Sequence, residues 1–294
     1  MEVNNRFRQK IALVTGATSG IGRETVKELA ALDMELYLLV RNRPKGEQLI
    51  LDIQKQTANT KLHLLVGDLS SLDDVRRVAE EFKRLNKPLD ILLNNAGVFN
   101  FKRKRSIDGF EEMFAVNHLA HFLLTHLLLD NLKEGTASRI VNVASGAHSL
   151  VKGINFEDLN FRRGFKALKV YSHSKLANLL FTYELAKRLK DSRVTVNAVD
   201  PGEVSTGLGR QNGWFSKILF WIMKPFLQSP QKGARTSIYV CTSLNIAGIS
   251  GKYFRDCKEK EPKTWAKDGE AAKKLWNMSL EMVNVVSSIP KDKL

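Results

Sequence analysis

The chain has 294 residues, of which 43% are hydrophobic, and carries a formal net charge of +15 with a pI near 9.8. Its two cysteines, Cys241 and Cys257, exclude a disulfide framework, and no apolar stretch is long enough to span a bilayer. No shift in composition marks a linker, so we expect a single domain over residues 1–294.

The basic residues are scattered, and the only basic run, residues 102–105, is not accompanied by a nucleic-acid-binding motif. We therefore expect no nucleic-acid partner. No basic-then-apolar leader precedes the first expected strand, which together with the cysteine content favours a reducing, cytoplasmic compartment.

Short apolar runs alternate along the chain with amphipathic helical stretches. Because the runs are continuously apolar, they predict strands buried on both faces, hence an α/β fold with a doubly wound parallel sheet of the Rossmann type. The expected strands are 11–14, 36–40, 62–66, 91–93, 140–143 and 194–199, and a terminal helix is expected over 270–286.

The first expected strand leads into a glycine-rich stretch, residues 15–22, followed by a good helix-forming sequence. Glycines here permit a tight turn and close approach of the backbone to a pyrophosphate, and a helix N-terminus attracts the anion. The Gly-x-x-x-Gly-x-Gly spacing of Gly16, Gly20 and Gly22 differs from the G-x-G-x-x-G fingerprint. A dinucleotide site and a purely structural turn therefore both remain open on this motif alone.

The end of the second expected strand bears on the choice of dinucleotide. An acidic residue there would accept hydrogen bonds from a free ribose 2′-hydroxyl, but the sequence offers Val40-Arg41-Asn42-Arg43. Arg41 can form a charge-assisted contact with a 2′-phosphate, so we expect NADP(H) rather than NAD(H). The alternative is an arginine that simply lies in solvent at the strand end.

Tyr171 and Lys175 stand four residues apart within a long helical pattern. This spacing places both side chains on one helix face, where the ammonium can favour the phenolate and lower the tyrosine pKa from its usual value of about 10. A proton-transfer pair and an ordinary amphipathic pair are both consistent with this spacing.

Six ordered motifs together make the chain similar to the short-chain dehydrogenase/reductases over about residues 8–255. Within that superfamily, residues 116–122, 140–145 and 174–181 and the long separation of Ser145 from Tyr171 resemble the retinol dehydrogenase branch. The motifs are residues 15–22, Asn94-Asn95-Ala96-Gly97, Asn117, Ser145, Tyr171-x-x-x-Lys175 and Pro201-Gly202.

The resemblance implies catalytic roles for Asn117, Ser145, Tyr171 and Lys175. Tyr171 would be the general acid in carbonyl reduction and the general base in alcohol oxidation, while the nicotinamide passes hydride. Lys175 would lower the tyrosine pKa, with help from the positive charge of the oxidised nicotinamide, and would hold the ribose. Ser145 would orient the substrate oxygen, and Asn117, inside a helix, would help hold water that connects Lys175 to solvent. Taken singly, Ser145 also fits a strand-end turn and Asn117 a capping amide.

The resemblance also implies a cofactor site. Asp68 would contact the adenine, although an N-cap for the helix beginning near Ser71 is the alternative. Asn94, Ala96 and Gly97 would form the floor beneath the cofactor, and a close-packed turn is the alternative for these three. The full set of expected cofactor-binding residues is Gly16, Thr18, Ser19, Gly20, Ile21, Gly22, Arg41, Asp68, Leu69, Asn95, Ala96, Gly97, Tyr171, Lys175, Pro201, Gly202, Val204 and Thr206.

One position departs from the family pattern. Asp200 precedes Pro201, where related dehydrogenases often carry histidine or arginine, so a contact made there by a basic residue is in doubt.

Substrate information is concentrated in a variable helical lid, about residues 205–228. Its apolar stretch 214–227 favours a small lipophilic alcohol or carbonyl compound, retinol and retinal by resemblance, with steroids and fatty aldehydes equally compatible. A core or dimer-contact helix is the alternative. Lys217 and Lys224 also leave a peripheral contact with an anionic membrane open. The remaining C-terminal part, about residues 259–294, is expected to form a helical tail.

Three further expectations complete the sequence reading. His118, His121 and His126 share one helical segment without acidic or cysteine ligands, so we expect no metal site. A homo-oligomer is consistent with the fold class by analogy. A non-catalytic NADP(H)-binding interaction protein is the competing functional class, and the intact Asn117, Ser145, Tyr171 and Lys175 argue against it.

Overall fold

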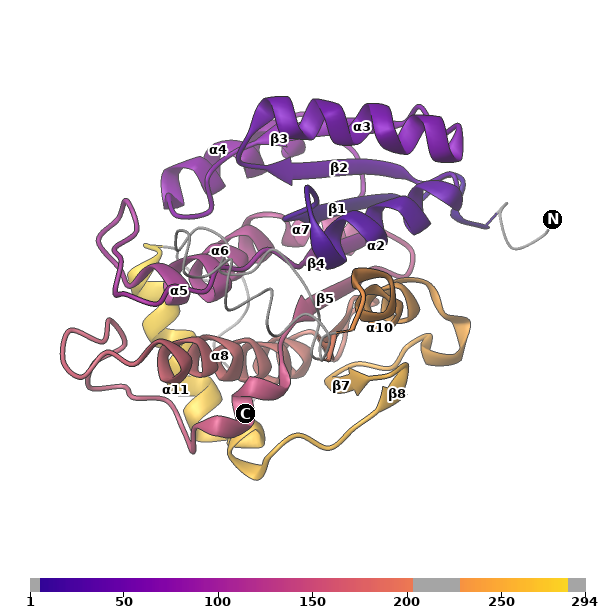
Figure 1. Ribbon diagram of the computed structural model, residues 1–294. Helices are drawn as coiled ribbons and strands as arrows, with labels where there is room; N and C mark the ends of the chain where they lie inside the picture. Colours follow the sequence, from indigo (N-terminus) through magenta and orange to yellow (C-terminus); the bar gives the residue numbers. More distant parts are fainter. Residues whose placement is uncertain (1–5, 203–227, 285–294) are drawn as a thin grey trace.

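In the computed structural model, which describes residues 6–202 and 228–284, eight strands form one sheet in the order β3-β2-β1-β4-β5-β6-β7-β8 (Figure 1). All neighbouring strands are parallel except β7 and β8. The strands are β1 (Ile11–Thr15), β2 (Glu35–Val40), β3 (Leu62–Val66), β4 (Ile91–Asn94), β5 (Arg139–Val143), β6 (Thr195–Asp200), β7 (Lys252–Arg255) and β8 (Lys258–Glu259).

Helices cover both faces of the sheet, which confirms the predicted doubly wound α/β architecture (Figure 1). One layer consists of α2 (Gly20–Ala31), α3 (Arg43–Thr57) and α10 (Pro230–Thr242). The other consists of α4 (Leu72–Lys83), α6 (Ala120–Leu127), α8 (Ala167–Arg188) and α11 (Gly269–Met282). Shorter helical segments are α5 (Glu112–Phe114), η1 (Ala115–Leu119), α7 (Leu129–Glu134), η2 (Gly146–Leu150), η5 (Leu244–Ile246) and η6 (Thr264–Lys267).

The continuous apolarity of the strands has the expected cause. Within β1, Leu13 packs into the core beneath α4, α6, α8 and α11, whereas its neighbours Ala12 and Val14 pack into the core beneath α2, α3 and α10. Because both faces are buried, the strand cannot alternate apolar with polar residues. The six strands predicted from the sequence are confirmed to within one residue at each end.

The sheet order reverses between β1 and β4, since the chain proceeds outward from β1 to β2 and β3 and then returns to β4 on the other side. In open parallel sheets, ligands bind in the crevice at the carboxyl ends of the strands at this switch point. The loops after β1, β2, β4 and β5 all open onto this edge.

The sequence did not predict β7 and β8, which extend the sheet beyond β6. β8 has two exposed residues, and the turn between the strands is Asp256-Cys257, with φ of 52° and 58°. Two-residue hairpins of this kind usually carry Asn-Gly or Asp-Gly, so the turn has no strong local signature.

The predicted C-terminal helix is present as α11. Trp276 is buried against Phe122 of α6 and Phe181 of α8, with ring centroids 5.1 and 6.0 Å away, and the Arg188 guanidinium lies 4.4 Å from its ring. The helix therefore docks on the body of the domain through α8. The predicted lid, 205–228, lies outside the described residues apart from its last position.

Candidate active site

The turn between β1 and α2 leaves space that only glycine permits. Gly16 has a φ of +68°, and a Cβ there would lie 2.8 Å from the Cα of Ala96. A Cβ on Gly22 would overlap the Gly16 carbonyl oxygen and lie 2.5 Å from Asn95 Nδ2. The turn is thus packed directly against the loop after β4, with the N-terminus of α2 facing the cavity.

Thr15 joins this turn to the loop after β4. Its Oγ1 accepts hydrogen bonds from the backbone N–H groups of Asn95 and Ala96, both at 2.9 Å. The Asn117 carbonyl can only accept, so His121 Nδ1–H donates to it at 3.1 Å, and His121 Nε2 accepts from the Thr15 hydroxyl at 2.9 Å. The floor of the cavity is therefore held by a continuous chain of hydrogen bonds.

The expected role of Asn94 as part of that floor is wrong. Its side chain is buried within the fold, where Nδ2 donates to Asn142 Oδ1 at 2.8 Å and to Thr125 Oγ1 at 3.1 Å. Because Asn94 is the last residue of β4, its side chain binds neighbouring elements, and Asn95, Ala96 and Gly97 line the cavity instead.

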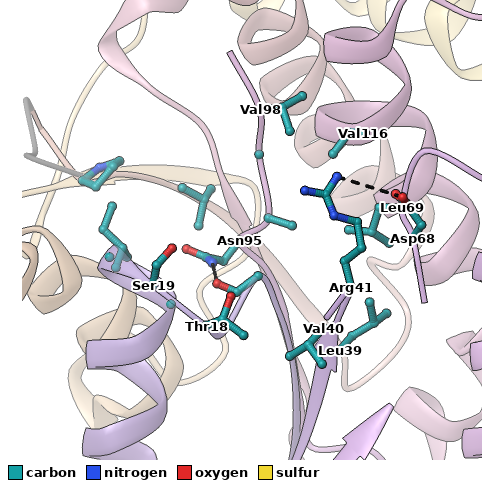
Figure 2. Close-up of a pocket in the computed structure, with 18 of the residues that line it drawn as sticks. Thr18, Ser19, Leu39, Val40, Arg41, Asp68, Leu69, Asn95, Val98 and Val116 are labelled. Atoms are coloured by element: carbon teal, nitrogen blue, oxygen red, sulfur yellow. Dashed lines mark hydrogen bonds and ion pairs between the residues drawn. The ribbon is translucent and has the colours of Figure 1, made fainter. Parts of the chain in front are cut away.

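At the other end of the cavity, Arg41 extends from the end of β2 toward Asp68, with Val98 and Val116 on the opposite side (Figure 2). The Arg41 and Asp68 side chains form an ion pair at 4.0 Å and are 68% and 31% exposed. No carboxylate neighbours Arg41 in the sequence. Asp68 comes from the end of β3, and the parallel pairing of β2 with β3 brings it near.

Asp68 is not the N-cap of α4, since Ser71 occupies that position and its Oγ accepts the Asp74 N–H. The Asp68 carboxylate instead accepts the Ser70 N–H at 2.9 Å, while its backbone N–H donates to Asp74 Oδ2 at 2.8 Å. These bonds fix the loop after β3 in place beside the cavity.

The catalytic end combines α8 with the loop after β5. Lys175 is 3% exposed, its Nζ donates to the Val143 carbonyl at 2.9 Å, and it lies 5.6 Å from the centre of the Tyr171 ring. Ser145 caps η2, with Oγ accepting the Ala147 N–H at 3.2 Å, and its hydroxyl acts on the pKa of Tyr171.

The electrostatics of the pair differ from the sequence-based expectation that Lys175 lowers the tyrosine pKa. Burial raises the Tyr171 pKa, the hydrogen bond with Ser145 opposes this rise, and the negative charge of Asp200 adds to it. Burial lowers the pKa of Lys175 to about 8, and Asp200 opposes that change. Loss of hydration is therefore the largest influence on the pKa of both groups.

Asn117 lies inside a helical segment, as expected, and that segment is the π-helix η1. Its side chain accepts the Val98 N–H at 2.8 Å and donates to the Val98 carbonyl at 3.1 Å and to Ser174 Oγ at 2.9 Å. The amide thus ties the loop after β4 to α8, one residue before Lys175.

These groups meet at a cavity of about 450 Å³, within the range of small-molecule and cofactor sites. Of the expected site residues, Asn117 lies behind its wall, and Val204 and Thr206 fall outside the described residues. The remainder line it: Gly16, Thr18, Ser19, Gly20, Ile21, Gly22, Arg41, Asp68, Leu69, Asn95, Ala96, Gly97, Ser145, Tyr171, Lys175, Pro201 and Gly202.

Comparison with known proteins decides the family: residues 10–214 match the family described as short chain dehydrogenase. The chain is a short-chain dehydrogenase. It is 44% identical to retinol dehydrogenase 12 of Bos taurus, covering 94% of this chain and 87% of that protein. It is 42% identical to human retinol dehydrogenase 11, covering 94% and 86%.

Solved structures agree on the fold. An uncharacterised protein from Mycobacterium paratuberculosis matches with a TM-score of 0.77 at 32% identity, over 97% of this chain and 96% of that chain. A 3-ketoacyl-(acyl-carrier-protein) reductase from Brucella melitensis, complexed with NADH, matches with a TM-score of 0.64 at 25% identity, over 84% and 96%. The dehydrogenase is therefore an oxidoreductase of CH–OH groups that uses a nicotinamide cofactor.

The cavity of this short-chain dehydrogenase suits such a cofactor. Gly16 and Gly22 form a cradle that any Cβ would fill, next to a helix N-terminus that favours phosphate. Arg41 supplies a planar cation at the far end, and Tyr171 and Lys175 stand at the near end. The dinucleotide would therefore extend from Arg41 past the glycines to the catalytic pair.

Sequence reasoning missed two cationic residues that line the cavity, Lys45 and Lys104. Lys45 lies in the first turn of α3, where its N–H donates to the capping Asn42 Oδ1 at 2.9 Å. The helix cap Asn42, followed three residues later by lysine, is a sequence signal that could have placed Lys45 in the first turn of a helix beside Arg41. Lys104 belongs to the basic run 102–105, which nothing in the sequence linked to the cofactor crevice.

His118 and His126, the other two histidines of the predicted group of three, have structural partners. His118 Nε2 contacts Ser279 Oγ at 3.0 Å, and His126 Nδ1 contacts the Phe122 carbonyl at 3.1 Å. Within residues 6–202 and 228–284, no group of three or more His, Cys, Asp or Glu side chains is placed to hold a metal ion. None of the helices in those ranges has the length and apolarity required to cross a membrane.

Proposed function

We propose that this enzyme is an NADP(H)-dependent oxidoreductase that interconverts a lipophilic, retinol- or retinal-like alcohol and its aldehyde or ketone, with Tyr171 as general acid and base. One observation carries the proposal. Tyr171, Ser145 and Lys175 face the same cavity as the glycine turn and Arg41, so a proton donor, an oxygen-orienting hydroxyl and a dinucleotide cradle meet in one place.

The protein's own groups account for the proton transfer. Tyr171 Oη would donate its proton to the carbonyl oxygen in reduction and accept one from the alcohol in oxidation. The Ser145 hydroxyl would donate a hydrogen bond to the same oxygen, where negative charge develops. Lys175, held by the Val143 carbonyl, would keep a positive charge beside the phenol. When bound, the nicotinamide supplies or accepts the hydride.

The raised pKa of Tyr171 fixes the protonation state in which the resting enzyme meets its substrate, whereas the ratio of reduced to oxidised cofactor sets the net direction. Burial keeps the phenol neutral at physiological pH, which is the form that donates a proton. Oxidation requires the phenolate, and the positive charge of an oxidised nicotinamide would help Lys175 to stabilise it. A carbonyl reductase activity therefore fits the resting protonation state.

The preference for NADP(H) rests on the charges at the Arg41 end. Arg41, Lys45 and Lys104 line the cavity there, and a 2′-phosphate would provide the anion that suits them. Two carboxylates also line the cavity. Glu112 accepts a hydrogen bond from Asn100 Nδ2 at 2.7 Å, and Asp68 is paired with Arg41. The local balance is thus positive.

A lipophilic substrate is supported by the surroundings of Tyr171 and by the relatives. The Phe99 ring packs edge-on against Tyr171 at 5.4 Å and against Phe101 at 5.3 Å. Leu168, one helical turn before Tyr171, is 54% exposed. The two relatives described above are named retinol dehydrogenases, which points to a retinoid-like compound.

The test is a panel of retinal, a steroid ketone and an aliphatic aldehyde, each assayed with NADPH and NADH by loss of cofactor absorbance. We expect retinal with NADPH to give the highest kcat/KM. A higher value for steroid or fatty aldehyde would replace the retinoid assignment, and a preference for NADH would refute the Arg41 argument.

Tyr171→Phe separates catalysis from binding. It should lower turnover by about 10³-fold while NADPH binding, followed by fluorescence, stays intact. Tyr183→Phe, on the same helix but away from the cavity, is the matched control. Equal rates for Tyr171→Phe and the wild type would remove the mechanism. NADPH binding without turnover of any compound would instead support the non-catalytic interaction protein.

A further inference from the structure

A buried carboxylate lies at the end of β6, directly before Pro201 and Gly202 of the cavity wall. Asp200 is 1% exposed. Its Oδ1 accepts the Gly202 N–H at 2.9 Å, and its Oδ2 accepts the Tyr253 hydroxyl at 2.8 Å and lies 3.5 Å from the Arg255 guanidinium. Both oxygens therefore accept from donors, as expected of a carboxylate.

The same carboxylate adjoins the turn that carries Ser145. Gly146 follows Ser145, and a Cβ on Gly146 would lie 3.2 Å from Asp200 Oδ2. His148 Nδ1 contacts the Ser145 carbonyl at 2.8 Å, and its ring packs edge-on against Tyr253 at 5.4 Å. Asp200 and Tyr253 thus support the turns at the ends of both β5 and β6.

Asp200 also lies where its charge acts on Lys175. Val199, its predecessor, pairs with Val143 in the parallel register of β5 and β6, and the Val143 carbonyl accepts the Lys175 ammonium. Asp200 favours the charged form of Lys175 and disfavours that of Tyr171. A buried charge in a site with little water acts over a longer range than a charge at the surface.

Other ionisable groups around the pair do not supply that charge. His121 of α6 and His148 of η2 face this region, and burial lowers the pKa of both, to about 4 for His121, so they are neutral near pH 7. Arg255 of β7 is a cation that is 41% exposed, and Tyr253 of β7 is a neutral phenol whose pKa burial raises. Within the described part of the chain, Asp200 is the anion that acts on Lys175.

We propose that Asp200 is a positioning residue: a buried carboxylate that serves as counter-ion to Lys175 without a direct ion pair, and whose hydrogen bonds brace the turns that carry Ser145 and Gly202. The inference rests on the proposed function, because it assumes that Tyr171 and Lys175 form the proton-transfer pair. Asp200 itself moves no proton to the substrate. It sets the pH range in which Lys175 remains a cation and Tyr171 a neutral acid.

The sign of the expected effect follows from the charges. Lys175 acts as a cation, so the rate of carbonyl reduction falls as pH rises through its pKa. Asp200→Asn removes the negative charge, lowers that pKa, and should move the alkaline fall in rate to lower pH by about one unit. The acid limb of alcohol oxidation, which reports Tyr171, should move in the same direction.

Two neighbouring substitutions separate charge from support. Arg255→Gln removes the cation that competes for Asp200, so the alkaline limb should move the opposite way, by about 0.3 unit because Arg255 is partly solvated. Tyr253→Phe removes a hydrogen bond but no charge, so it should lower kcat/KM several-fold without moving the profile. If Tyr253→Phe moved the pH profile as far as Asp200→Asn does, the role of Asp200 would be structural only.

A titration of the cofactor-free protein provides a readout that does not depend on turnover. The ¹³Cε signal of Lys175, assigned with Lys175→Arg, should titrate at lower pH in Asp200→Asn and at higher pH in Arg255→Gln. An unchanged midpoint in both variants overturns the proposal even if the enzyme is active. If no carbonyl compound is reduced, the same shifts would still show the counter-ion, and only the proposed function would fail. Should Asp200→Asn not fold, Arg255→Gln, at a half-exposed position, decides the question alone.

Discussion

The two ends of the cavity hold their charges in different ways. At the adenosine end, Arg41 and Asp68 are 68% and 31% exposed and stand 4.0 Å apart, so water and salt weaken their interaction. At the catalytic end, Lys175 and Asp200 are 3% and 1% exposed, and the same kind of charges displace pKa values. The exposed charges at the adenosine end can select a cofactor, whereas the buried charges at the catalytic end set the protonation states of Tyr171 and Lys175.

The difference also appears in the hydrogen bonding. The backbone at the catalytic end is tied by Thr15, Asn117 and Asp200, each of which contacts two separate segments of the chain. Among residues 6–202 and 228–284, the Arg41 side chain forms one ion pair, with Asp68. Substitutions at the catalytic end should therefore have large effects that couple to pH, and those at the adenosine end smaller effects that couple to salt.

The largest expected effect is that of Lys175→Met. Turnover should fall by about 10³-fold, because the buried cation beside Tyr171 is lost. The variant should nevertheless be more stable than the wild type, since the folded protein holds Lys175 at a pKa of about 8 against 10.5 when unfolded. The cost of keeping it charged in the fold, on the order of 3 kcal/mol, is removed.

The pH dependence of this stability gain has a definite sign. Between pH 8 and 10.5 the unfolded chain binds more protons at Lys175, so wild-type stability rises with pH in that window. The advantage of Lys175→Met should be full below pH 8 and absent above 10.5, as measured by urea unfolding. A variant less stable than wild type at pH 7 would contradict the assignment of Lys175 as a poorly solvated cation.

A second, smaller effect is expected for Gly22→Ala. The added Cβ meets the Gly16 carbonyl and the Asn95 amide, neither of which can move without shifting the turn. The affinity for NADPH should fall by about 100-fold, measured by isothermal titration. Gly153→Ala is the control, because a Cβ at Gly153 meets no heavy atom within 4 Å. Equal losses in both variants would show a general intolerance of alanine.

Arg41→Ala should have a more modest effect. We expect KM for NADPH to rise by about 10-fold while KM for NADH is unchanged. The difference in KM for NADPH between the variant and the wild type should shrink as salt is raised. Lys45→Ala should act in the same direction but less strongly, as a point charge without bidentate geometry. A parallel rise in both KM values would mean that these residues hold the adenosine rather than a phosphate.

The smallest effect is expected for Arg43→Ala. Arg43 lies between Arg41 and Lys45 in sequence but does not line the cavity, and its exposed side chain pairs with Glu47 at 3.8 Å. KM for NADPH should change by less than about two-fold, because exposed ion pairs of this kind contribute little. A change as large as that of Arg41→Ala would show that net charge, rather than placement, governs cofactor choice.

The elements that the sequence predicted are those whose signal is local. Buried parallel strands must be continuously apolar, so residues 11–14 or 36–40 identify themselves without their neighbours. Tyr171 and Lys175 are related by helix spacing alone, and the turn at Gly16 to Gly22 requires glycine for steric reasons in the turn itself. Such features can be read from the order of residues.

The features that were missed depend on contacts between distant segments. Asp68 meets Arg41 because β2 and β3 pair, and Lys104 reaches the cavity from the loop after β4, 63 residues beyond Arg41 in the chain. Asn94 belongs to the same motif as Asn95 but points into the core, since β4 still continues at that residue. The pKa of Tyr171 likewise depends on how much water the fold removes.

The amino-acid sequence by itself determined the fold class, the glycine turn and the identity of the groups available for proton transfer, because each of these depends on residues close together in the chain. Only the tertiary structure decided how these groups are charged and which of them act together. Asp200, Tyr253 and Lys175 come from β6, β7 and α8, and their interaction exists because the packed sheet holds them in a space from which water is excluded.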